Sequence, residues 1–87
     1  MTNEIHKYKK IVPIEAEQFR ATNKQISDYH IGLERSKGHH HQVKSYYLPT
    51  REGEMLLHLG DYIATGVKGE HWAIDKDIFE KTYERVE

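Results

Sequence analysis

Short apolar runs separated by glycine-containing turns fill the second half of the chain, and this spacing limits the folds that are open to it. Three such runs of four to six residues are 54–59, 62–65 and 70–74. The turn signal Gly60-Asp61 separates the first two, and 66–69 separates the last two. Runs this short between turn residues are typical of β-strands. The spacing therefore predicts an antiparallel meander of three strands.

The first half of the chain predicts one strand and one short helix. Residues 11–19 predict a strand with Pro13 at its start or at a sheet edge, because proline lacks the N–H that a ladder needs. A helix is predicted from an N-cap at Asn23 to about Ile31, closed by Gly32.

The remaining segments complete the predicted fold. Segment 34–44 is polar and predicts an exposed loop, and 43–48 predicts a strand that Pro49 ends. Asp75 or Asp77 then caps a last helix with an apolar stripe. The fold class is therefore α+β. We expect a small antiparallel β-meander or partly open barrel, with one short inserted helix and a C-terminal helix, in one domain spanning 1–87.

Composition excludes several classes of protein. The chain has 87 residues, 13 Lys and Arg, 14 Asp and Glu, and no cysteine. Without cysteine there is neither a disulfide scaffold nor a cysteine-ligated zinc site. The net charge of −1 argues against generic nucleic-acid binding. No apolar run approaches the ~18–20 residues that cross a bilayer, and the start lacks the apolar region of a signal peptide, so we expect a soluble, cytoplasmic protein.

The charge is divided unequally along the chain. Residues 1–45 carry eight Lys and Arg against five Asp and Glu, whereas 46–87 carry five against nine. A basic half and an acidic half can attract each other within the fold or across a contact between two copies. They can equally be two solvated faces, because salt screens such fields.

Aromatic and cationic side chains suggest a binding surface. Adjacent strand residues face opposite ways, so one ring of the Tyr46-Tyr47 pair is expected to point out of the core. Tyr, Trp and Arg dominate binding hot spots, and they also stack on nucleotide-like ligands. The candidate binding residues are Tyr46, Tyr47, Arg51, Lys68 and Trp72. The alternative is that these rings only wrap the edges of the core.

Histidines give two weaker candidate sites. If 54–59 and 70–74 flank the same strand, His58 and His71 could act with Glu70 as a general acid–base pair or a partial metal site. They can equally be half-exposed strand histidines. The run His39-His40-His41 invites a metal interpretation, but adjacent loop residues seldom converge on one ion, and we expect no metal there. No nucleophile elbow or phosphate-binding glycine loop is present, so we expect no enzyme and no cofactor.

The second half also resembles a family of small, mostly uncharacterised bacteriophage and prophage proteins. The resemblance lies in Glu52-Gly53-Glu54-Met55, Leu59-Gly60-Asp61-Tyr62-Ile63, Gly66-Val67-Lys68-Gly69-Glu70 and Asp77-Ile78-Phe79-Glu80-Lys81-Thr82-Tyr83-Glu84, after an early strand of the type Ile14-Glu15-Ala16 followed by Gln18-Phe19. Many relatives have proline where this chain has Leu59 and Lys76. The resemblance implies a phage origin and a host-cell cytoplasmic setting, and it supplies no catalytic residue.

Three functions follow as hypotheses. The first is a phage-encoded, non-enzymatic protein that binds a host protein, as an inhibitor of an antiviral defence system, and that forms homo-oligomers. The second is a protein that sequesters a nucleotide-like ligand. The third is a metal-assisted hydrolase built on His58, Glu70 and His71.

Overall fold

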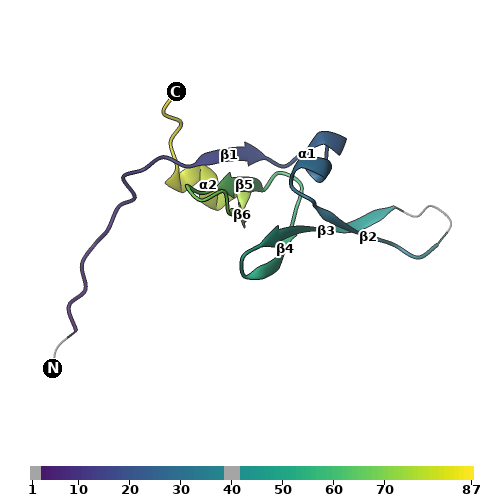
Figure 1. Cartoon of the computed structure of the whole chain (residues 1–87), viewed down its shortest axis with the longest axis horizontal. Coiled ribbons are helices and arrows are strands. Elements are labelled where there is room, and N and C mark those ends of the chain that lie inside the picture. Colours follow the sequence, from purple (N-terminus) through teal and green to yellow (C-terminus); the bar gives the residue numbers. More distant parts are fainter. Residues whose placement is uncertain (1–2, 39–41) are drawn as a thin grey trace.

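The computed structural model describes residues 3–38 and 42–87. Its strands form two antiparallel sheets, which we name the first sheet (order β1-β5-β6) and the second sheet (order β2-β3-β4) (Figure 1). The elements are β1 (Glu15–Gln18), α1 (Asn23–Asp28), β2 (Gly32–Arg35), β3 (Val43–Thr50), β4 (Gly53–Leu57), β5 (Tyr62–Thr65), β6 (His71–Ile74) and α2 (Lys76–Thr82). The predicted α+β class, with a C-terminal helix and antiparallel strands that do not close into a barrel, is confirmed.

One predicted strand pairing is wrong. β5 does pair with β6, but its other neighbour is β1, with Ala16 opposite Ala64, and β4 pairs with β3 instead. The turn at Gly60-Asp61 carries the chain from one sheet to the other. Phe19 fixes this turn, because its N–H donates to the Asp61 carbonyl at 2.7 Å and its carbonyl accepts from the Gly60 N–H at 2.9 Å. A tight turn therefore makes a corner here and not a hairpin.

The segment after α1 also differs from the prediction. Part of the expected loop 34–44 belongs to β2, which pairs with β3 and shifts register between Glu34 and Arg35. Gly32 begins this strand and does not close the helix. β3 likewise runs through Pro49 to Thr50. Long-range pairing overrides the local turn signals in this region.

Helix α1 is shorter than predicted and is held by its side chains. Its N-cap is Thr22, not Asn23, and the Thr22 hydroxyl accepts from the Gln25 N–H at 3.1 Å. Gln25 is buried, and its amide bonds the Arg20 N–H and the Gln18 carbonyl, each at 2.8 Å. These bonds fix α1 against the end of β1, because a buried amide must find partners.

The main core lies between the two sheets. Ile63 of the first sheet meets Leu48 and Leu57 of the second, and the loops add Phe19 and Ile31. Tyr46 packs its ring against the edge of Phe19, with 5.0 Å between centroids. Burying these side chains supplies most of the stabilisation that so small a core can offer.

Helix α2 covers the opposite face of the first sheet. Tyr62 precedes the core residue Ile63 and so points to that opposite face. Its ring stacks on Phe79 at 3.9 Å, and Phe79 stacks on Tyr83 at 4.8 Å. The helix begins at the predicted cap Asp75, whose carboxylate accepts from the Asp77 and Ile78 N–H groups. The central strand β5 is therefore covered on both faces.

Residues 3–14 form an arm that leads away from the sheets (Figure 1). The strand predicted over 11–19 therefore begins only at Glu15. The arm exposes Ile5, Tyr8 and Ile11 by 94%, 91% and 87%. It contributes to a radius of gyration of 16.2 Å, well above the ~12 Å of a compact chain of this length. None of the described helices is long or apolar enough to cross a membrane.

Candidate functional site

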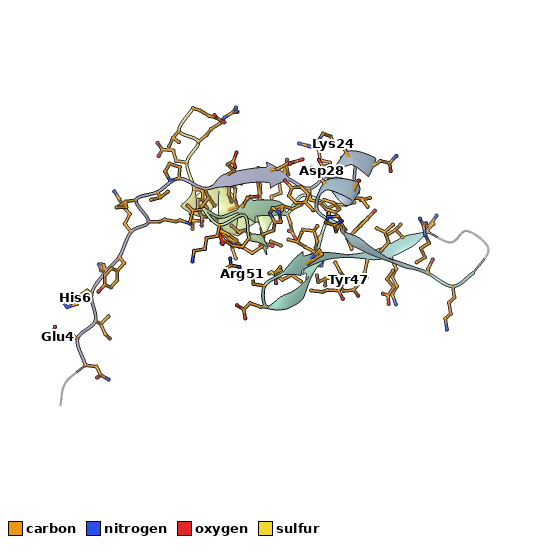
Figure 2. All side chains as sticks on the ribbon, viewed as in Figure 1. Glu4, His6, Lys24, Asp28, Tyr47 and Arg51 are labelled. Atoms are coloured by element: carbon orange, nitrogen blue, oxygen red, sulfur yellow. The ribbon has the colours of Figure 1, made fainter. Side chains whose placement is uncertain are left out.

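The five predicted binding residues do not share one surface. Tyr46 turns to the core, whereas Tyr47 lies opposite Leu56 on the outer face of the second sheet (Figure 2). Trp72 alternates with Ala73, which packs on the core, so Trp72 points to the outer face of the first sheet. Tyr47 and Trp72 therefore lie on opposite sides of the core and cannot stack on one ligand.

Three of the five residues nevertheless gather around Glu70. Arg51, in the turn between β3 and β4, reaches across with its Nη2 3.6 Å from Glu70 Oε2 (Figure 2). The Lys68 N–H points to Glu70 Oε1 at 3.4 Å. We name Arg51, Lys68, Glu70 and Trp72 the turn cluster. Glu70 links the turns of the two sheets.

Gly66 brings Trp72 into this cluster. A Cβ at position 66 would lie 1.6 Å from Glu70 Oε1 and 3.1 Å from Trp72 Cζ3. The carboxylate and the indole can approach only because glycine leaves this space empty. Lys10 of the arm places its Nζ 5.5 Å from the centroid of the Trp72 ring, within the range of a cation–π contact.

The turn cluster offers the chemistry of a protein contact. The Arg51 side chain is 60% exposed even though it pairs with Glu70, and Val67, next to Lys68 in the turn between β5 and β6, is also exposed. Arginine and tryptophan are among the residue types that most often carry binding energy in protein contacts.

The predicted histidine site is not assembled. His58 follows β4 and lies 3.4 Å from Asp61 through its Nδ1 and the Asp61 carboxylate. His71, in β6, has its Nδ1 3.0 Å from the Thr65 hydroxyl. Each of the three side chains has a different partner: His58 meets Asp61 beyond the end of β4, His71 meets Thr65 in the first sheet, and Glu70 meets Arg51, so they do not form one centre. In residues 3–38 and 42–87 no group of three His, Asp or Glu could hold a metal ion. His39, His40 and His41 lie outside the described residues.

Sequence reasoning missed a polar group on the inner face of the first sheet. The Tyr29 hydroxyl donates to Glu17 Oε2 at 2.7 Å, and the Tyr29 ring meets the His71 ring edge to face at 5.0 Å. Burial, and then the bond to Glu17, raise the pKa of Tyr29 above its ordinary value. The alternation of 11–19 places Glu15 and Glu17 on one face, but only the docking of α1 brings Tyr29 to them.

A cavity of about 200 Å³ lies beside this group. Its lining consists of Glu15, Ala16, Glu17, Tyr29, Ile63 and Thr65. We name it the Glu15–Glu17 cavity. Two carboxylates at its wall favour a cation and oppose a phosphate.

Comparisons with protein-family models, with curated proteins and with solved structures find no match for this chain. The resemblance to bacteriophage proteins therefore stays a prediction.

Proposed function

We propose that the chain is a non-enzymatic binding protein that contacts a protein partner through the turn cluster. The observation that carries the proposal is the ion pair of the exposed Arg51 guanidinium with Glu70, whose carboxylate meets Trp72 in the space that Gly66 leaves open. Holding the arginine in place lowers the entropy that binding must remove.

A host protein is the proposed partner. The resemblance of the second half to bacteriophage proteins supports a phage origin, action in the host cytoplasm and, among host proteins, a component of an antiviral defence system.

The two other hypotheses have less support. A nucleotide-like ligand would need Tyr47 and Trp72 on one side, but they lie on opposite sides of the core. The Glu15–Glu17 cavity carries the wrong charge for a phosphate. A hydrolase would need His58 and His71 together, and they belong to different regions.

The test is a pull-down from bacterial host lysate with the tagged full chain and two charge-reversal variants. Lys68→Glu changes the turn cluster, and Lys81→Glu makes the same change on α2. We expect one stoichiometric protein with the wild type and with Lys81→Glu, and at least about tenfold less with Lys68→Glu.

Equal recovery with both variants would overturn the choice of surface. A thermal-shift panel of nucleotides completes the test, because a ligand that binds only the folded state raises the melting temperature. A shift with one nucleotide, without a protein partner, would favour the sequestering hypothesis over ours.

A further inference from the structure

Strand β1 has an open edge. Among residues 3–38 and 42–87 it pairs with β5 alone, and the first sheet ends there. Phe19 turns both its N–H and its carbonyl toward the β5 side, so the same holds for Glu17 and Glu15, which are two and four residues before it. The backbone groups of Ala16 and Ile14 therefore point outward, to the open edge.

The open edge continues from β1 into the arm, and arm residues 9–14 line a groove together with α2 and the C-terminal residues 83–87. Gln25 already bonds the Gln18 carbonyl, so α1 closes the far end of the edge. Pro13 is two residues before Glu15, so the N–H that proline lacks would also have pointed to the β5 side. Pro13 therefore removes no hydrogen-bond donor from the open edge. An antiparallel segment can therefore add along residues 12–17.

The charges at this edge select what can add there. Two copies of β1 placed side by side would bring Glu15 and Glu17 against each other, and like charges on facing strand residues are destabilising. The arm has the opposite pattern, with Lys7 and Lys9 two residues apart. The same spacing of two puts both lysines on one face of an extended chain.

We propose that the arm of a second copy of this chain adds to β1 as an antiparallel strand, and that the exchange is reciprocal. In the register that we propose, Lys9 of one copy lies opposite Glu15 of the other, and Lys7 lies opposite Glu17. This register is centred on Val12, so one two-fold axis generates both contacts. The result is a continuous six-stranded sheet across two copies.

Both faces of the incoming arm meet matching surfaces. The lysines lie on the face of the Glu15–Glu17 cavity, where Lys9 meets the Glu15 carboxylate and Lys7 meets the Glu17 carboxylate, which already accepts from Gln25 and Tyr29. Tyr8 falls opposite Ala16 on the other face, beside a groove of about 1140 Å³ whose lining combines Ala16, Tyr62, Phe79 and Tyr83 with residues 9–14 of the chain's own arm. Tyr8, which is 91% exposed in the single chain, thus gains apolar contact in addition to the charge pairing.

The inference does not rest on the proposed function, because it uses none of the exposed residues of the turn cluster. Its test is the mass of the full chain in solution, measured by light scattering after gel filtration. We expect a concentration-dependent species of twice the 10.3 kDa of one chain, and weaker association at high salt.

Charge exchange tests the register. The Glu15 side chain is exposed and has no hydrogen-bond or ion-pair partner among the described residues, so its reversal should leave the fold intact. We expect Lys9→Glu and Glu15→Lys each to weaken the dimer by about tenfold or more, because each variant faces like charge with like. An equal mixture of the two variants restores both ion pairs and should bind to within about threefold of the wild type. Lys44→Glu, an exposed change on β3, is the matched control and should change nothing.

Removal of residues 2–10 is the second test, because these residues add no side chain to the core and the shortened chain should still fold. This variant should be a monomer. A wild type that stays monomeric at the highest soluble concentration would overturn the proposal, as would a shortened chain that still dimerises. So would a mixture of two folded charge variants that fails to recover the dimer.

Discussion

The two sheets bury their residues in different ways. In β5 of the first sheet the adjacent residues Ile63 and Ala64 are both 0% exposed, although they point to opposite faces. In β4 of the second sheet the adjacent leucines Leu57 and Leu56 are 1% and 49% exposed. On the outer face of the first sheet, α2 covers Tyr62 by stacking Phe79 on it, and Ala64 lies between its paired neighbours Ala16 and Trp72. A helix of seven residues thus helps to cover the central strand of this sheet on its outer face.

The two leucines of β4 give the sharpest test of this comparison. Leu57→Ala removes a side chain from the closed core and should lower the free energy of unfolding by about 3 kcal/mol. Leu56→Ala, one residue earlier, should cost less than about 0.5 kcal/mol. Chemical denaturation of both variants measures the difference. Similar losses would mean that the outer face of the second sheet is also covered.

The packing of α2 on the outer face of the first sheet can be disrupted at Phe79. Phe79→Ala breaks the stacks with Tyr62 and Tyr83 and should cost about 2 kcal/mol, less than a fully buried phenylalanine because Phe79 is only half-buried. The exposed neighbour Ile78 is the control, and Ile78→Ala should have little effect. Thermal melting followed by circular dichroism checks both. An unchanged melting temperature for Phe79→Ala would show that α2 does not stabilise this face.

A smaller effect is expected where α2 begins. Asp75→Ala removes the acceptor of two N–H groups and should cost about 1 kcal/mol. Asp77→Ala removes only a charge from the first turn and should cost less, about 0.3 kcal/mol. Chemical denaturation of the two variants in parallel separates the contribution of the N-cap to the free energy of unfolding from that of the charge in the first turn. Equal losses would contradict the assigned cap.

The smallest effect is one of pH on the inner face of the first sheet, and it begins only above the ordinary tyrosine pKa of 10.0. The pKa of Tyr29 is raised in the folded chain, so above pH 10 the unfolded chain has released a proton that the folded chain keeps. Its contribution to stability is therefore complete below pH 10 and decreases as the pH rises further.

Tyr29→Phe checks this sign, since phenylalanine has no proton to lose. The stability of the wild type should decrease more steeply above pH 10 than that of the variant. Parallel slopes would show that the bond from Tyr29 to Glu17 does not control the titration.

Local sequence predicted the elements of the second half well. The strands at 62–65 and 71–74 and the cap at Asp75 follow from alternation, turn residues and an acceptor before a helix. Local sequence did not predict a strand whose pairing partner is distant in the chain. The strand at Gly32–Arg35 has no alternating apolar pattern, and it exists because β3 offers it a ladder.

The candidate site was predictable only in part. Arg51, Lys68 and Trp72 could be chosen by residue type, and the structure places the Arg51 side chain, the Lys68 backbone N–H and, at Gly66, the Trp72 ring around Glu70. The sequence suggested Glu70 for a different site with His58 and His71. The type of a residue indicates which interactions its side chain can make. Which residues lie next to it depends on how the turns of the two sheets meet in the fold.

The sequence by itself determined where this chain turns and which strand residues alternate, because glycine conformation and side-chain period are local properties. Only the tertiary structure decided that Gly60-Asp61 makes a corner between sheets, since the partners of that turn come from Phe19, more than forty residues away. It likewise decided that Tyr47 and Trp72 lie apart. A short apolar run predicts that a segment forms a strand. Which other strand it pairs with depends on which side chains the complete fold buries.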